Sequence, residues 1–241
     1  MMTNQPCIGL IVPPAHGRVP ADAQTLYGER YRFIARGLGI GSVSPAGFAP
    51  VMDDIVAHAC ALRDAGAQVV SLMGTSISFH QGPEFTDALR DAMRRASGLP
   101  CSTMSHGVVA ALRELGIRRV AVATSYIDEL NRQLQRYLTQ LGFEVTAIEG
   151  LSIDDVGGAN KVSTESLVEL SARVLERDRS AQGIFISCGG LLTLDAIRIL
   201  EARYGLPVTA SSPAAFWDVV RLGGWDARSA GAGRLFEGSP A

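Results

Sequence analysis

Short apolar runs alternate along the chain with longer stretches in which apolar residues recur every three or four positions. The apolar runs are rich in β-branched residues, a pattern that predicts buried strands. Most of them are continuous rather than alternating, which is typical of strands covered on both faces of a parallel sheet. The predicted strands span residues 7–12, 67–73, 100–103, 117–123, 144–148, 184–187 and 207–211.

The stretches between these runs have the periodicity of amphipathic helices. One predicted helix carries the apolar positions Val51, Ile55, Ala59 and Leu62 and stops at Gly66. Three more are predicted over 130–141 with Asp128 as N-cap and Gly142 as terminator, over 167–175 after Ser163, and from Ser212-Pro213 onward. Strands that alternate with helices predict an α/β fold with mainly parallel sheets.

A faint internal repeat divides the chain. The segment "VVSLMGTS" (69–76) resembles "IFISCGGL" (184–191) when Gly74 is set against Cys188, and "SGLPCSTMS" (97–105) resembles "YGLPVTASS" (204–212). General likeness between α/β halves could also produce such a pattern. We predict two similar Rossmann-like halves related by pseudo-two-fold symmetry, 1–115 and 116–241, with the helix of 213–222 packing back on the first. Ligands of open α/β sheets bind outside the carboxyl ends of the strands, so we expect the site between the halves.

Composition narrows the class of partner. The chain has 241 residues, of which 47% are hydrophobic and 19% are charged, and its formal net charge is −2. Charges are scattered rather than grouped, so neither a nucleic acid nor a membrane surface is expected as partner. No apolar run approaches the ~20 residues of a membrane span, and no signal peptide is visible. We therefore expect a cytoplasmic protein. We also expect a small-molecule partner and a monomer, although the composition does not fix the oligomeric state.

Several familiar sites are missing from the sequence. The four cysteines form no CxxC pair, which disfavours structural zinc, and a disulfide framework is not expected in a cytoplasmic chain of this size. There is no phosphate-binding loop, dinucleotide fingerprint, GxSxG elbow or HExxH motif. The single lysine, Lys161, stands in a predicted loop and is a poor candidate for a Schiff base. We expect neither a metal nor an organic cofactor.

The residues at the predicted strand ends are small, neutral and rich in hydrogen-bond donors. They include Gly74-Thr75-Ser76, Thr124-Ser125-Tyr126 and Cys188-Gly189-Gly190. Hydroxyls and closely approaching backbone N–H groups can bind a carboxylate without a cationic side chain. Preorganised neutral donors also stabilise charge that spreads into an enediolate. A thiol has an ordinary pKa of ~8.5, so Cys188 is a candidate proton donor to carbon.

Motifs over residues 9–218 give the chain a family resemblance. They are "GLIVPPAHG", "VVSLMGTSISF", "VAVATSYIDELN", "FISCGGLLTLDAI" and "SSPAAFWD". In this order they resemble the aspartate/glutamate racemase superfamily, which includes the maleate isomerases, and within it the arylmalonate decarboxylase family. The racemases and maleate isomerases carry two cysteines, one in each half. Here the second-half cysteine is Cys188, and its first-half counterpart is Gly74.

The resemblance implies a carboxy-lyase for a small dicarboxylate substrate. It would decarboxylate α-aryl or α-alkenyl malonates enantioselectively and without a cofactor, giving 2-arylalkanoic acids through an enediolate that Cys188 protonates. The implied dioxyanion hole for the retained carboxylate consists of Thr75, Ser76, Tyr126, Cys188 and Gly189. The implied apolar pocket for the departing carboxylate consists of Pro14, Ile40, Val43, Ile77, Val156 and Gly190.

The chain departs from the family pattern in its pocket. Ile40 and Ile77 stand where leucine is the commoner choice, and Ala159 stands where a bulkier apolar residue is expected. The pocket's size and the preferred α-substituent therefore stay open, as do the physiological substrate and the handedness of the product.

Two other functions also stay open. A cysteine-dependent racemase or a maleate-type cis–trans isomerase would need a second acid/base at Gly74. A non-catalytic protein that binds small acids would use the glycines and hydroxyls without the thiol.

Overall fold

The computed structural model describes residues 5–155 and 157–238. Its first four strands are β1 (Cys7–Val12), β2 (Arg32–Gly37), β3 (Val69–Leu72) and β4 (Cys101–Thr103). The helices in this part are α1 (Asp22–Tyr27), α2 (Pro45–Phe48), α3 (Met52–Asp64), α4 (Thr75–Phe79), α5 (Pro83–Ser97) and α6 (Met104–Glu114), with a 3-10 turn, Ala49–Val51, before α3.

The rest of the chain repeats this pattern of elements. Its strands are β5 (Arg119–Thr124), β6 (Glu144–Gly150), β7 (Gly183–Ser187) and β8 (Val208–Ala210). Its helices are α7 (Asp128–Gln140), α8 (Thr164–Arg177), α9 (Leu194–Tyr204) and α10 (Ser211–Leu222), with 3-10 turns at Ala159–Lys161 and Arg234–Phe236.

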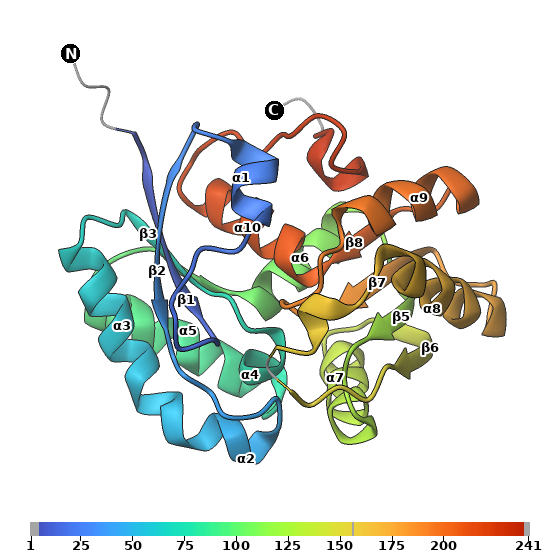
Figure 1. Cartoon of the computed structure of the whole chain (residues 1–241), viewed down its shortest axis with the longest axis horizontal. Coiled ribbons are helices and arrows are strands. Elements are labelled where there is room, and N and C mark those ends of the chain that lie inside the picture. Colours follow the sequence, from blue (N-terminus) through green and yellow to red (C-terminus); the bar gives the residue numbers. More distant parts are fainter. Residues whose placement is uncertain (1–4, 156, 239–241) are drawn as a thin grey trace.

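The eight strands form two parallel sheets with the same order. The orders are β2-β1-β3-β4 and β6-β5-β7-β8, so each strand of the first sheet has a counterpart in the second (Figure 1). All the strand pairs are parallel. The predicted fold of two similar α/β halves is confirmed. Gly74 follows β3 and Cys188 follows β7, which are equivalent strands, so the two positions aligned by the sequence repeat correspond in the fold.

The structure corrects the sequence prediction at three places. Strand β2 was not predicted because it lies at a sheet edge, is only partly buried, and carries Arg32 and Arg36 instead of a continuous apolar run. Asp128 is the first residue of α7, and the N-cap is Ile127, whose side chain makes no capping bond. Helix α10 begins one residue before Ser212, at Ser211, because the chain leaves β8 and turns directly into the helix.

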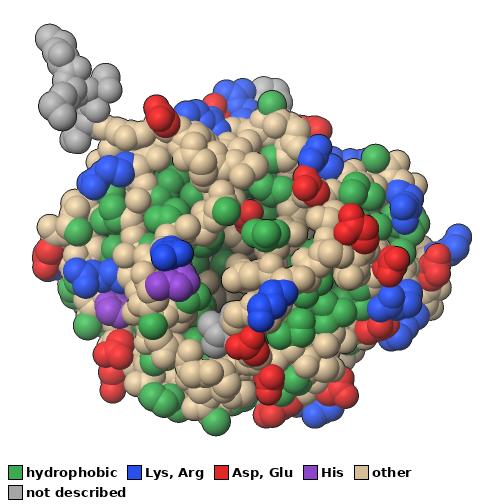
Figure 2. All heavy atoms as spheres, in the orientation of Figure 1, with side chains coloured by type: hydrophobic (Ala, Val, Ile, Leu, Met, Phe, Trp, Pro, Cys, Tyr) green, Lys and Arg blue, Asp and Glu red, His purple; other side chains and the backbone are tan. Residues whose placement is uncertain are grey.

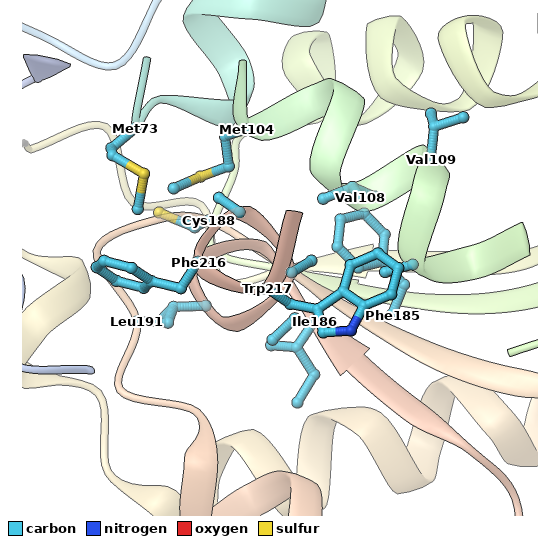
Figure 3. Packing of buried hydrophobic residues seen from close by; sticks show 14 of the residues in the cluster. Met73, Met104, Val108, Val109, Phe185, Ile186, Cys188, Leu191, Phe216 and Trp217 are labelled. Atoms are coloured by element: carbon cyan, nitrogen blue, oxygen red, sulfur yellow. The ribbon is translucent and has the colours of Figure 1, made fainter. Parts of the chain in front are cut away.

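Helix α10 packs against α6, and in Figure 1 the two helices lie side by side between the sheets. A Cβ on Gly107 of α6 would lie 2.9 Å from the Cα of Ala215, so the glycine allows the two backbones to approach closely. Phe216 and Trp217 of α10 are buried in this region together with Val108 of α6 (Figure 3). Helix α10 thus follows the second sheet in sequence but packs against a helix of the first part.

The segment after α10 returns to α1. The Tyr31 hydroxyl donates to the carbonyl of Asp226 at 2.7 Å, and the Ser229 hydroxyl donates to the carbonyl of Leu26 at 2.7 Å. These bonds connect the segment after α10 to α1 and to the residues that follow it.

Candidate active site

A cavity of about 320 Å³ lies where the carboxyl ends of strands from both sheets face each other. Figure 2 shows this face hollowed near its centre, with a histidine and a basic side chain on the margin of the hollow. The cavity is lined by residues that follow β1, β3, β5, β7 and β8. They include Pro13, Pro14, Met73, Gly74, Thr75, Ser76, Ser125, Tyr126, Cys188, Gly189, Gly190 and Ser212.

The turn at Gly74 presents the first turn of α4 to the cavity. Thr75 and Ser76 are the first two residues of this helix, and the N–H groups of a first turn have no acceptors within the helix. The Ser78 hydroxyl lies 2.8 Å from the carbonyl of Gly74, and the Ser105 hydroxyl lies 3.1 Å from the carbonyl of Thr75. These buried hydroxyls hold the turn in place and leave its N–H groups available to an anion.

Neutral hydroxyl groups stand beside this turn. The Thr75 hydroxyl donates to the sulfur of Met104 at 2.9 Å. The Ser187 hydroxyl donates to the hydroxyl of Tyr126 at 3.3 Å, and Tyr126 is only 1% exposed. Burial raises the pKa of Tyr126 far above its ordinary value, and the nearby Cys188 raises it further, which outweighs hydrogen bonds to Ser187, Thr75 and Ser76. Tyr126 is therefore a neutral donor at any physiological pH.

Cys188 occupies a turn in which two glycines, Gly189 and Gly190, follow it. Its N–H donates to the hydroxyl of Ser211 at 3.1 Å, and the N–H of Gly190 donates to its sulfur at 3.5 Å. Its φ angle is +152°, a value that residues other than glycine rarely adopt. Burial raises the pKa of the Cys188 thiol, while hydrogen bonds from the Ser125 hydroxyl and the N–H groups of Gly190 and Leu191 lower it in part. The thiol is thus protonated at neutral pH and available as an acid.

The Gly74 and Cys188 turns approach each other across the cavity. A Cβ on Gly189 would lie 3.4 Å from the carbonyl oxygen of Met73 and 3.0 Å from the sulfur of Met104, so a side chain at Gly189 would crowd this contact. In Figure 3 the side chains of Met73 and Met104 extend toward Cys188. The two strand ends aligned by the repeat therefore lie close together in space.

The cavity also has an apolar wall. Of the residues assigned to the apolar pocket, Val156 lies outside the described residues, and the others all line the cavity: Pro14, Ile40, Val43, Ile77 and Gly190. Ala159 lines it too, and a Cβ on Gly190 would lie 3.1 Å from the Ala159 Cβ. The small side chain at 159 therefore stands directly against the glycine turn that follows Cys188.

Sequence reasoning did not assign several other cavity residues. Ser125 stands in the strand-end run noted in the sequence, but nothing there indicated that it adjoins the thiol. Asp22 comes from α1, is 6% exposed, and has a pKa raised by burial and lowered in part by the Ser212 hydroxyl. No local pattern could have placed it here. The remaining unassigned residues are Val12, Pro13, His16, Arg18, Val19, Pro20, Ala21, Phe48, Met73, Ile153, Asp155, Asn160, Leu191, Leu192 and Ser212.

Residues 5–155 and 157–238 contain neither a membrane-spanning helix nor a metal-binding cluster. None of their helices is long and apolar enough to cross a membrane. Nor do these residues contain a group of three or more His, Cys, Asp or Glu side chains that could hold a metal ion.

Comparison with solved structures places this fold in a class. The maleate isomerase Iso from Pseudomonas putida S16 has the same fold, with a TM-score of 0.90 at 23% identity over 97% of this chain and 98% of that one. The class is therefore the two-sheet fold of the maleate isomerase-like proteins.

Closer relatives define the family. The model of the arylmalonate decarboxylase family matches residues 8–236. The chain is 52% identical to arylmalonate decarboxylase of Bordetella bronchiseptica over 98% of both chains. It therefore belongs to the arylmalonate decarboxylase family, and the resemblance identified from its motifs is confirmed.

A solved relative carries substitutions at the two aligned positions. It is the Gly74Cys-Cys188Ser mutant of arylmalonate decarboxylase in the liganded form, with a TM-score of 0.95 and 51% identity over 97% of this chain and 100% of that one.

Proposed function

We propose that the chain is a carboxy-lyase that converts α-aryl or α-alkenyl malonates into one enantiomer of the 2-arylalkanoic acid without a cofactor. Family membership supports the reaction class. The observation that carries the proposal is the asymmetry of the cavity: a protonated thiol, Cys188, stands at one strand end and a glycine, Gly74, at the equivalent strand end.

The retained carboxylate is held by neutral donors. The hydroxyls of Thr75, Ser76 and Tyr126 and the backbone near Cys188 and Gly189 surround one part of the cavity. Thr75 must turn its hydroxyl from the Met104 sulfur toward the substrate, which costs one weak hydrogen bond. Since all these donors are neutral, their bonds strengthen as negative charge grows on the carboxylate in the transition state.

The other carboxylate leaves from the apolar wall formed by Pro14, Ile40, Val43 and Ile77, together with Gly190. Water solvates the ionised group, and an apolar wall does not, so loss of neutral CO2 is favoured there. The electron pair of the breaking C–C bond moves into the retained carboxylate and produces an enediolate.

Cys188 then gives its proton to the α-carbon. The S–H bond breaks, a C–H bond forms, and the resulting thiolate recovers a proton from water, so each turnover releases one CO2 and consumes one proton. Because Gly74 has no side chain, only the face of the planar enediolate that meets Cys188 receives a proton. The product is therefore a single enantiomer.

The racemase or isomerase alternative needs a second acid/base at the position of Gly74, which has no side chain. Cys101 is the first residue of β4, at the end of the strand away from the cavity, and its thiol donates to the Leu99 carbonyl at 3.4 Å. A non-catalytic binding protein would not need an acidic hydrogen at Cys188. Binding of a small acid that survives alkylation of Cys188, with no turnover beforehand, would favour that function.

Incubation with phenylmalonate and with its α-methyl analogue in D2O tests the proposal. We expect release of CO2 and one deuterium at the α-carbon, with the α-methyl product formed as one enantiomer. A racemic product formed at the enzymatic rate would exclude Cys188 as the only proton donor. Absence of CO2 release from any arylmalonate would refute the reaction.

We also propose that the enzyme is a cytoplasmic monomer. Among the described residues, the large apolar side chains that are exposed are few, and two of them line the cavity: Val19 and Leu192 at the cavity, and Ile199 and Leu222 elsewhere. Light scattering should give a molar mass near 25.5 kDa, and fractionation of the native host should recover the activity with the soluble cytoplasmic proteins.

A further inference from the structure

Ser125 and Cys188 stand next to each other at the ends of neighbouring strands. The last registered pair of β5 and β7 is Thr124 with Ser187, and the two residues of interest each follow by one position. Neighbouring strands lie about 4.8 Å apart. The Ser125 N–H donates to the carbonyl of Ser187 at 3.3 Å, and the Ile153 N–H donates to the Ser125 carbonyl at 2.8 Å. The backbone at Ser125 is therefore fixed beside the thiol.

The Ser125 side chain faces the cavity that contains the Cys188 sulfur. Ser125 is 2% exposed and lines this cavity. Its hydroxyl lowers the pKa of the Cys188 thiol and so opposes the effect of burial. Nearby hydroxyls have other partners: Ser187 donates to the Tyr126 hydroxyl, and Ser211 accepts the N–H of Cys188.

Proton transfer to carbon leaves a thiolate that the Ser125 hydroxyl can stabilise. When Cys188 gives up its proton, a thiolate forms in a buried cavity that also holds the product carboxylate. A buried charge without donors is costly, and a hydrogen bond to an ionised acceptor is stronger than one to a neutral acceptor. The Gly190 N–H, 3.5 Å from the sulfur, supplies one donor. A side-chain donor from the neighbouring strand β5 would stabilise the thiolate further and direct the S–H bond toward the substrate.

We propose that Ser125 is a positioning residue, which donates its hydroxyl hydrogen to the Cys188 sulfur and stabilises the thiolate left by proton transfer. Its role in turnover rests on the proposed decarboxylation, whereas its effect on the thiol exists in the free enzyme. The two can therefore fail separately.

Other titratable groups also face the thiol or its cavity. Tyr126 comes from the end of β5, Asp22 from α1, and His16, Arg18 and Asp155 from the surrounding loops. Tyr126 remains neutral because burial raises its pKa. Ionised Asp22 or Asp155 would oppose a thiolate, and Arg18 would favour one. Variants at Ser125 leave all five groups in place, so a comparison with wild type isolates the hydroxyl.

The test is the pH dependence of Cys188 alkylation by iodoacetamide in the free enzyme, followed by mass spectrometry of the peptide that contains Cys188. In Ser125→Ala the midpoint should rise by about one pH unit, because a hydrogen bond to a charged group is typically worth that much. With phenylmalonate, kcat should fall by about tenfold while KM stays within about twofold, since the hydroxyl acts on the donor and not on substrate binding.

Ser212→Ala is the matched control for the alkylation profile. It removes a buried hydroxyl from the same cavity, but from the strand end on the other side of β7, and this hydroxyl makes no hydrogen bond to the sulfur. Its alkylation midpoint should not rise above that of wild type, because the Ser212 hydroxyl acts on Asp22, and its loss leaves the Asp22 carboxyl less ionised. Ser125→Thr and Ser125→Val form a second comparison, because their side chains have similar shapes and only threonine carries a hydroxyl. The alkylation midpoint of Cys188 should be higher in the valine variant.

Equal midpoints in wild type and Ser125→Ala, or in the threonine and valine variants, would overturn the proposal whatever the activity. A shift of the midpoint without CO2 release from any arylmalonate would support the contact and refute the function.

Discussion

We predict that the backbone conformation at Cys188 is strained and that substitution by glycine would relieve the strain. Its φ of +152° is accessible to glycine and unfavourable for any residue with a Cβ. Cys188→Ala and Cys188→Gly both remove the thiol, but only the glycine variant also removes the Cβ. The difference in the free energy of unfolding between these two variants therefore measures the strain.

The expected difference follows from three contributions. Relief of a rarely populated backbone conformation contributes about 1–3 kcal/mol in favour of glycine. The greater freedom of glycine in the unfolded chain costs about 0.4–1 kcal/mol. Loss of one partly buried methyl group costs at most about 0.8 kcal/mol. The central expectation is that Cys188→Gly is more stable than Cys188→Ala by about 1 kcal/mol, or about 2–4 °C in Tm for a chain of this length.

Urea denaturation followed by circular dichroism measures both variants. Ala65→Gly is the control, because Ala65 is exposed and has an ordinary φ of −82°, and the greater freedom of glycine in the unfolded chain should lower the stability by about 0.4–1 kcal/mol. If Cys188→Gly is less stable than Cys188→Ala by as much as the control change, the turn is not strained and the reasoning is refuted.

Four further predictions concern the cavity. Cys188→Ser should lower the rate of decarboxylation by about 10²- to 10⁴-fold with the fold intact, because a hydroxyl is a much weaker acid than a thiol; a rate within about threefold of wild type would exclude Cys188 as donor. Thr75→Ala should reduce kcat/KM by about 10²-fold, as loss of one donor to the developing charge does in other enzymes, and unchanged steady-state kinetics would exclude this hydroxyl from carboxylate binding. Gly74→Cys should racemise optically pure 2-arylpropionate, which chiral chromatography would detect. The variant should lose about 1–3 kcal/mol of stability, because the added Cβ would stand 2.5 Å from Ile77 Cγ2. A folded variant that leaves the acid optically pure would refute the two-faced geometry. Asp22→Asn should raise the stability at pH 7, because burial raises the folded-state pKa of this carboxyl. Wild type therefore loses stability as the pH rises from the unfolded-state pKa of about 3.9 through the folded-state pKa. The gain should vanish in denaturation curves below pH 4, and a gain that persists there would have another cause.

The sequence predicted the features that depend on local pattern. All seven predicted strands are present, and most of them are continuous apolar runs, whereas β2 was missed because this edge strand is only partly buried and carries arginines. The likeness of the two halves was visible because equivalent strands end in similar turns. The roles assigned to Cys188, Thr75 and Tyr126 stay predictions, although these residues line one cavity.

Other features depend on how distant segments meet, and the sequence could not indicate them. Ser125 adjoins Cys188 through the register of β5 with β7, which no spacing along the chain encodes. Asp22 reaches the cavity from a helix more than a hundred residues away from Cys188 in sequence. The extent of the apolar wall at 156 stays a prediction, since Val156 lies outside the described residues.

The packing of α10 against α6 has a consequence for the order of folding during synthesis. Strands β1 to β4 leave the ribosome early, but α10, which covers α6 and contacts β3 and β4, ends only at Leu222. Before α10 has been synthesised, the face of α6 that it will bury is exposed to solvent. Exposed apolar surface on a nascent chain promotes aggregation. We expect the first sheet to reach its final stability after nearly the whole chain has been made, so truncation before Ser211 should leave both sheets unstable. The residue that accepts the Cys188 N–H, Ser211, opens this same helix. The cavity around the thiol is thus completed at the same late step that completes the fold.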